Sequence, residues 1–157
     1  MTSLEIIEKV DDIFRHQWNE ENALSVPEAE SVALISNHAK LIDGTVLYAD
    51  LNDSTALVDG HKHWFAAEIY KSYLLSASQI IKDNNGEITA FDGDRVMGVF
   101  IGDRKNSSAV KAALQINFIV MKINDKIKER YPDSTYKLKQ SIGIDTSKLF
   151  VARTGVR

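Results

Sequence analysis

The feature that most constrains the fold is a hairpin pattern placed between two long amphipathic segments. Residues 87–91 and 95–101 are predicted to be short strands, and the Asp92-Gly93 pair between them is typical of a two-residue turn. Apolar residues recur every three or four positions across residues 63–82 and again across residues 106–130. That spacing predicts two helices that each bury one face.

A further strand is predicted on each side of this helix–hairpin–helix unit. Residues 45–51 form a near-continuous apolar run, which favours a strand covered on both faces. Residues 136–144 alternate apolar and polar side chains, and a last strand is predicted at 149–152 after a turn at 145–148. The order strand, helix, hairpin, helix, strand predicts an α+β fold with a ferredoxin-like βαββαβ core.

The first part of the chain has a different pattern. Residues 3–19 place apolar side chains at helical spacing, and Ser3 is a candidate N-cap. Pro27 suits the first turn of a short second helix. We interpret residues 1–43 as a helical N-terminal extension to a domain that spans residues 44–157.

Composition excludes several classes of protein. With 157 residues, 44% hydrophobic and 26% charged, the chain has the size and composition of one globular domain. No apolar run is long enough to span a bilayer, and the acidic N-terminal segment is unlike a targeting peptide. The absence of cysteine excludes a disulfide framework and a thiolate metal site. The net charge of −3 argues against binding to nucleic acid. We expect a cytoplasmic protein with neither nucleic acid nor membrane as a partner.

Two aspartates occupy positions that the predicted topology brings together. Asp50 ends the first strand, and Asp94 lies at the tip of the hairpin. Taking the first strand and the first strand of the hairpin as neighbours, we expect the two carboxylates to face each other. A divalent cation would relieve their repulsion, and a site with only oxygen ligands favours Mg²⁺ or Mn²⁺. The alternative is an ordinary strand end and an ordinary hairpin turn.

A polar turn directly follows the first of these aspartates. Residues 52–55 precede a short predicted helix at 56–59, whose free N–H groups would suit phosphate oxygens. Alternatively, Asn52 or Asp53 simply caps that helix. With two metal ions in such a site, one would lower the pKa of a ribose hydroxyl and the second would hold a triphosphate for in-line displacement.

Other polar residues are weaker candidates. His61 and His63 are two residues apart, so on a helix they would point to different faces and would not share a metal ion. Arg95 could reach a phosphate, but it is interpreted as solvated surface charge. Ser54 and Thr55 have no obvious activating histidine, so nucleophilic catalysis is not expected.

Three motifs, YADLNDST, ITAFDGDRVMGVF and SIGIDTSKLFVA, resemble the catalytic domain of the class III nucleotide cyclases. In that family the acid that ends the first strand and the acid at the hairpin tip hold two metal ions. These positions are Asp50 and Asp94 here. The resemblance also implies that Leu51 offers its backbone carbonyl to a metal ion. The turn residues implied to contact the phosphates are Asn52, Asp53, Ser54 and Thr55.

A longer resemblance runs from VPEAESVALISNH to the closing GVR. It is to the pyrimidine nucleotide cyclases of bacterial Pycsar anti-phage defence. Purine cyclases commonly carry a base-reading lysine four residues before the second metal acid, and Ala90 stands at that position. Alanine cannot donate a hydrogen bond to a purine. Tyr48 lies two residues before Asp50 and is a candidate for lining the base pocket, with a core tyrosine as the alternative.

The resemblance implies an enzyme that converts UTP, or CTP, to 3′,5′-cyclic UMP, or cyclic CMP, and pyrophosphate, with two Mg²⁺ or Mn²⁺ ions per site. The product would be a second messenger in antiviral defence. Sites of this family form between two protomers, which implies a homodimer. A further strand and helix of the family, with its transition-state Asn and Arg, would follow Arg157 and are not assigned. The alternatives are a purine (adenylate or guanylate) cyclase and a catalytically silent nucleotide-binding or dimerisation module.

Overall fold

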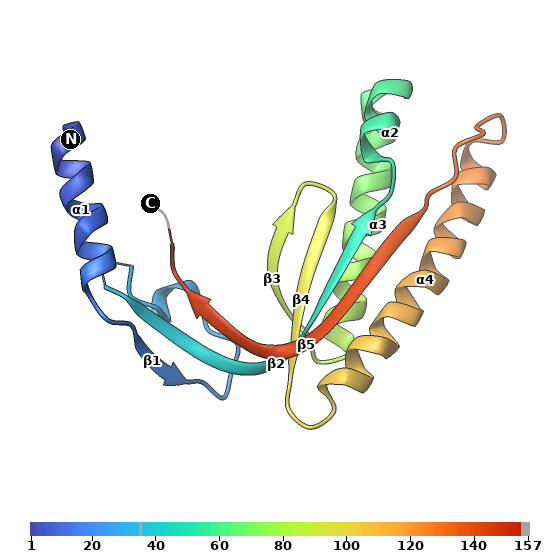
Figure 1. The fold of residues 1–157 in the computed structure, drawn as a ribbon. Coiled ribbons are helices and arrows are strands. Elements are labelled where there is room, and N and C mark those ends of the chain that lie inside the picture. The colour runs from blue at the N-terminus through green and yellow to red at the C-terminus, as the bar shows by residue number, and fades with distance from the viewer. Residues whose placement is uncertain (35, 155–157) are drawn as a thin grey trace. The chain divides into compact units, whose positions relative to one another are not determined.

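A computed structural model describes residues 1–34 and 36–154 of the chain (Figure 1). Residues 155–157, which belong to the resemblance above, lie outside the described residues. The chain divides into two compact units, one formed by Met1–Asp43 with Lys148–Arg157 and the other by Gly44–Ser147. Two long strands, β2 (His38–Leu51) and β5 (Gln140–Ala152), contribute residues to both units.

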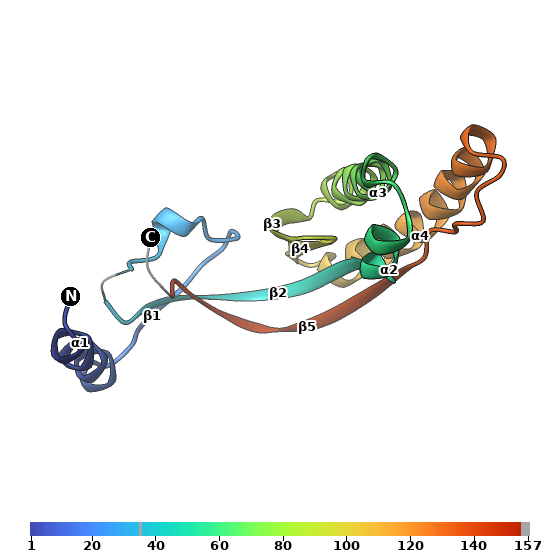
Figure 2. The same ribbon diagram turned by 90° about the horizontal axis from the view of Figure 1, so that it is seen from above.

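The unit Gly44–Ser147 has the predicted ferredoxin-like arrangement. Its strands lie in the order β5-β2-β4-β3, and its two long helices lie on one side of the sheet (Figure 2). Hydrogen bonds join residue 52 to residue 139 and residue 45 to residue 146, so β5 runs antiparallel to β2. The remaining elements of this unit are α2 (Ser54–Gly60), α3 (His63–Asp83), β3 (Glu87–Asp92), β4 (Arg95–Ile101) and α4 (Lys105–Arg130).

One predicted strand pairing is wrong. The neighbour of β2 is β4, the second strand of the hairpin, and the register pairs Asp50 with Arg95. The connection from β2 through α3 to β3 is a crossover between parallel strands, and it leaves a place between them that β4 fills. Because Asp94 directly precedes β4, this pairing also brings the hairpin tip to the end of β2.

Strand β2 is covered on one face only, which differs from the expectation of two covered faces. Leu47, Ala49 and Leu51 are buried in the core beneath the helices, whereas Tyr48 is 42% exposed and Asp50 is partly exposed. Successive side chains of a strand point to opposite faces, and both long helices lie on one side of this sheet. The interpretation of Tyr48 as a core residue is therefore wrong.

Two glycines make room for one core side chain. A Cβ atom added at Gly98 would lie 2.6 Å from Ile81 Cγ2, and one added at Gly86 would lie 2.7 Å from the same atom. Ile81 is fully buried on α3, against β4. The absent side chains allow the helix to approach the sheet closely.

The ends of several elements differ from the sequence-based expectation. The turn of the hairpin is formed by residues 93–94, because Asp92 still pairs with Arg95 and Gly93 adopts a positive φ of 61°. The turn expected at 145–148 does not form, since β5 continues through it. Within that stretch, Thr146 is bonded to the buried Thr45 and to Asn106 at the start of α4, which holds the polar residues in an extended strand.

The other unit begins with helix α1 (Ser3–Arg15), whose N-cap is Thr2 rather than Ser3. Thr2 and Glu5 exchange hydrogen bonds as a capping box. Strand β1 (Asn19–Asn22) then pairs in parallel with residues 38–41 of β2, and a single 3₁₀ turn, η1 (Ala29–Ser31), stands where a short helix was expected. The region interpreted as helical thus contains a strand of four polar residues, which carries no apolar alternation to predict it.

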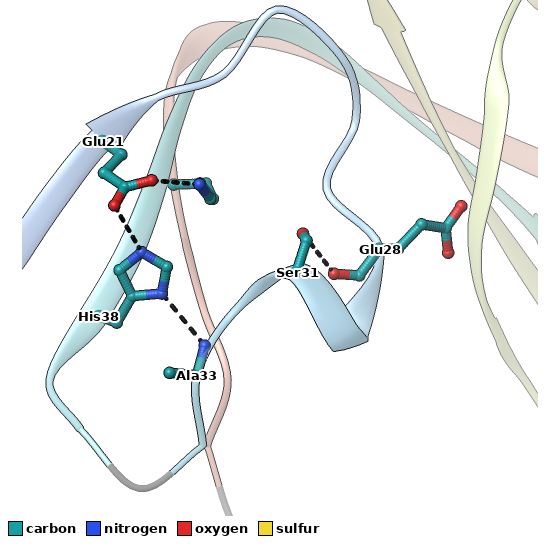
Figure 3. A network of polar contacts seen from close by, with 6 residues as sticks. Glu21, Glu28, Ser31, Ala33 and His38 are labelled. Carbon is teal, nitrogen blue, oxygen red and sulfur yellow. Dashed lines mark hydrogen bonds and ion pairs between the residues drawn. The ribbon is translucent and has the colours of Figure 1, made fainter.

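A polar network joins β1, β2 and Ala33, which lies in the segment between these two strands (Figure 3). The Glu21 carboxylate accepts a hydrogen bond from Lys40 and lies 3.5 Å from Nε2 of His38. Nδ1 of His38 accepts a hydrogen bond of 3.1 Å from the N–H of Ala33. The hydrogen bond and the charge of Lys40 lower the pKa of Glu21.

Candidate active site

The structure brings Asp50 and Asp94 to one end of the sheet, as the sequence predicts. Asp50 lies near the end of β2, and Asp94 lies in the turn that precedes β4. The N–H of Leu51 donates to the carbonyl of Asp94 at 3.4 Å, which fixes the two strand ends to each other. Both aspartates line an open cleft of about 830 Å³. Its walls are formed by Asp50, Leu51, Asn52, Asp53, Ser54, Thr55, Ala56, Asp59, Asp94 and Arg95.

Negative charge dominates this cleft. Burial raises the pKa of Asp50, and the nearby carboxylates of Asp94 and Asp92 raise it further, while Arg95 acts in the opposite direction. Arg95 Nε lies 3.6 Å from Asp50 Oδ1, and Arg95 Nη2 lies 3.1 Å from Asp92 Oδ2. Like charges that raise a carboxyl pKa are relieved by a bound cation, so this donor set suits a hard divalent ion.

The turn after β2 is fastened to β5 and opens into α2. The N–H of Asn52 donates to the carbonyl of Lys139 at 3.0 Å, and its Oδ1 accepts a hydrogen bond of 2.7 Å from Ser141. Asp53 adopts a left-handed conformation with φ of 59°, and within the described chain its side chain makes no capping hydrogen bond. The capping role considered for Asn52 or Asp53 is therefore not observed. Ser54 and Thr55 begin α2 at the wall of the cleft.

The register sets Asp92, Arg95 and Asp50 side by side across β3, β4 and β2, and we call this the acidic row. A second row of side chains crosses the sheet beside it. The register pairs Met97 of β4 with Ala90 of β3 and with Tyr48 of β2. Directly opposed residues share one face of a sheet, so these three side chains lie together on the face that carries Tyr48. This second row crosses β4 at Met97, two residues after Arg95. Tyr48 and the position of Ala90 are thus neighbours across a single strand, with Met97 between them.

Sequence reasoning missed two residues near the acids. Arg95 was assigned to solvated surface charge, because a charged residue on a short strand gives no signal of its partners. Tyr73 fits the apolar stripe of α3, yet its fully buried hydroxyl has no hydrogen-bond partner among the described residues. Burial raises the pKa of Tyr73, and the charges of Asp50 and Asp94 raise it further.

The remaining candidates do not join the site. The ring of His61 packs against Phe65 and Tyr136, with centroid distances of 5.1 and 5.3 Å. Across residues 1–34 and 36–154, no group of three or more His, Cys, Asp or Glu side chains is placed to hold a metal ion. A metal ion at Asp50 and Asp94 would thus need backbone or ligand oxygens to complete its coordination.

No family model matches the chain. It is 50% identical over 147 residues to the uridylate cyclase of Xanthomonas perforans, covering 93% of this chain and 64% of that protein. It is 47% identical over 149 residues to the uridylate cyclase of Burkholderia cepacia, covering 94% of this chain and 65% of that protein. The chain thus spans somewhat less than two thirds of the length of these relatives.

Among solved structures, the fold is similar to the adenylyl cyclase CyaB from Pseudomonas aeruginosa. The TM-score is 0.65 at 25% identity, over 75% of this chain and 62% of that one. The chain is a homologue of the uridylate cyclases and has the class III nucleotide cyclase fold. A class III adenylyl cyclase-like ATP-binding protein, also from Pseudomonas aeruginosa, shares this fold with a TM-score of 0.71 at 17% identity. That match covers 94% of this chain and 32% of the other.

The ferredoxin-like α+β core predicted from the sequence is confirmed. Within the described residues, no helix is both long enough and apolar enough to cross a membrane.

Proposed function

We propose that this cyclase homologue converts UTP to 3′,5′-cyclic UMP and pyrophosphate, with CTP as the second choice of substrate. The observation that carries the proposal is its 50% identity to a uridylate cyclase over 93% of the chain. The convergence of Asp50 and Asp94 on one cleft supports it, because two carboxylates at adjoining strand ends suit a metal-dependent reaction of a nucleoside triphosphate.

We propose that this site holds two Mg²⁺ or Mn²⁺ ions. Asp50 and Asp94 offer carboxylate oxygens, and the backbone carbonyl of Leu51 is proposed as a further ligand. The raised pKa of Asp50 supports this assignment, since its causes are burial and the negative charges around it. Bound ions would supply positive charge to the triphosphate and to the ribose 3′ oxygen.

We assign the turn after β2 to the phosphates and the row on the sheet face to the base. Asn52, Asp53, Ser54 and Thr55 border the cleft beside both acids. Asn52 would act partly by position, because its side chain is already bonded to Ser141 of β5. Tyr48 would line the base pocket.

In the proposed reaction, the ribose 3′ hydroxyl releases its proton to water and its oxygen forms a new bond to the α-phosphorus. The bond from that phosphorus to the bridging oxygen of the β-phosphate breaks, and pyrophosphate leaves with the electron pair. At the position of Ala90, a methyl side chain offers no donor to a purine ring, which favours a pyrimidine. Met97 and Tyr48, which share a row of the sheet with Ala90, would fill the space that the smaller base leaves.

We further propose that the protein acts in the cytoplasm as a homodimer, with each site completed across the interface, and that its product serves antiviral defence as in Pycsar systems. Analytical ultracentrifugation tests the dimer. A concentration-independent monomer that still makes cyclic UMP would contradict it.

The test of activity is incubation of the full-length protein with each of the four ribonucleoside triphosphates and Mn²⁺, followed by separation of the products. Cyclic UMP is expected as the main product. Cyclic AMP or cyclic GMP as the main product would favour a purine cyclase, and no cyclic product would favour a silent nucleotide-binding module.

Asp50→Asn and Asp94→Asn should each abolish turnover without loss of the fold, because each removes one charged metal ligand. Asp133→Asn, an exposed substitution in the loop after α4, is the matched control and should retain full activity. Full activity in either of the first two variants would contradict the assignment of the metal acids.

A further inference from the structure

Arg95 occupies the middle of the acidic row on the sheet. The ladder pairs it with Asp92 on β3 and with Asp50 on β2. Its Nη2 is 3.1 Å from Asp92 Oδ2, and its Nε is 3.6 Å from Asp50 Oδ1. One guanidinium group therefore bridges two carboxylates through different nitrogen atoms, a geometry that its planar fork allows.

The two contacts of this bridge are not equivalent. The contact to Asp92 has hydrogen-bond geometry, whereas the contact to Asp50 is an ion pair at the longer distance. The side chains of Arg95 and Asp50 are 47% and 43% exposed, so water can compete for the contact between them. The bond to Asp92 is thus the anchor of the guanidinium, and the contact to Asp50 is the one that can be exchanged.

We propose that Arg95 is an exchangeable counter-ion of Asp50, which a divalent cation displaces when it binds to Asp50 and Asp94, while Asp92 retains the guanidinium at the edge of the cleft. The inference rests on the proposed function, which places the cation at these two aspartates. It gives Arg95 a positioning role that the family resemblance does not assign.

The physical reason is competition between two cations for one carboxylate. Without a metal ion, Arg95 offsets the repulsion that Asp50 experiences from Asp94 and Asp92. A divalent ion takes over that function, and its charge repels the guanidinium from Asp50. Arg95 therefore weakens the binding of a free metal ion. A metal ion that arrives with a triphosphate brings compensating negative charge, so the site favours the metal–nucleotide complex over the free ion.

The test uses Mn²⁺ alone, without nucleotide, and measures free Mn²⁺ by electron paramagnetic resonance during titration of the whole protein. Arg95→Gln should bind Mn²⁺ roughly 3- to 30-fold more tightly than the native protein, because it removes one positive charge beside the site. Lys111→Gln makes the same change of charge at an exposed position on α4 and should alter the dissociation constant less than about 2-fold.

The anchor can be tested by a double-mutant cycle. Asp92→Asn releases the guanidinium toward Asp50, so Mn²⁺ binding should weaken. In the Arg95→Gln background the same substitution should have a clearly smaller effect, because no guanidinium remains to be released. Equal effects in both backgrounds would show that Asp92 does not act through Arg95.

Two failures are distinguishable. If Arg95→Gln binds Mn²⁺ no more tightly than the native protein, while Asp50→Asn and Asp94→Asn abolish binding, the counter-ion role is refuted and the metal site stands. If Mn²⁺ binding is indifferent to both aspartates, the proposed metal site fails and the counter-ion role fails with it. Circular dichroism of Arg95→Gln should match the native spectrum, as expected for an exposed side chain.

Discussion

A single methyl group at Gly98 should be enough to disturb the core. A Cβ atom there would lie 2.6 Å from Ile81 Cγ2 and 3.3 Å from Ile81 Cδ1, whereas packed carbon atoms are about 4 Å apart. Ile81 is fully buried, and a β-branched side chain in a helix has one strongly preferred rotamer, so it cannot turn away. Because overpacking of this kind costs about 1–3 kcal/mol, we expect Gly98→Ala to lower the free energy of unfolding by about 2–3 kcal/mol.

Thermal and urea denaturation followed by circular dichroism measure this loss. For a chain of this length, about 2–3 kcal/mol corresponds to a fall in Tm of roughly 4–12 °C. Gly60→Ala is the matched control, since a Cβ there meets nothing within 4 Å, and it should change stability by less than about 0.5 kcal/mol. The loss should shrink in an Ile81→Ala background, where the obstructing methyl group is gone. An undiminished loss in that background would refute the clash as its cause.

Two further predictions concern polar groups. Thr45→Val removes a buried hydroxyl that donates to Asn106 at 2.6 Å and is bonded to Thr146 at 2.9 Å. Asn106 keeps its hydrogen bond from Thr146, so the loss should be modest: the free energy of unfolding should fall by about 1–2 kcal/mol in urea denaturation. An unchanged midpoint of the urea transition would contradict this prediction. Lys40→Gln should raise the pKa of Glu21 toward its ordinary value in a carboxyl NMR titration. A carboxyl pKa that is lowered in the folded state stabilises the fold at pH values above the ordinary pKa of glutamate. The stability difference between native protein and variant should therefore vanish as the pH falls through the lowered pKa of Glu21. A difference that persists at low pH would contradict this prediction.

The two long helices were predicted within one residue of their observed ends, whereas the helix expected at residues 3–19 ends at Arg15. The expectation of residues 63–82 corresponds to α3 at His63–Asp83, and that of residues 106–130 to α4 at Lys105–Arg130. Apolar spacing reports which side of a helix is buried, and both helices bury a continuous stripe. The same periodicity cannot report how a strand is covered, since an apolar run looks alike on either face. That is why the apolar run favoured a strand covered on both faces, although Tyr48 is exposed on one of them.

Strand order and strand continuity depend on contacts far apart in the sequence. The choice of β4 over β3 as the neighbour of β2 follows from the crossover through α3, which no local pattern encodes. The stretch at 145–148 contains polar residues typical of a turn, yet Thr146 is held in β5 by Thr45 and Asn106. Those partners lie 101 and 40 residues away in the chain. Local turn propensity was therefore overruled by tertiary hydrogen bonds.

The meeting of Asp50 and Asp94 was predicted correctly from a wrong neighbour, because the hairpin turn adjoins both of its strands. The residues that surround the two acids depend more strongly on the exact position of the hairpin turn. A turn at residues 92–93 would pair Ala90 with Arg95, whereas the observed turn at residues 93–94 pairs Ala90 with Met97. The shift moves the partner of Ala90 by two residues along β4, so the opposed side chain stays on the same face but changes from arginine to methionine. The turn at residues 93–94, where Gly93 adopts a positive φ, leaves Asp92 in β3 opposite Arg95, and Arg95 is in turn paired with Asp50 on β2.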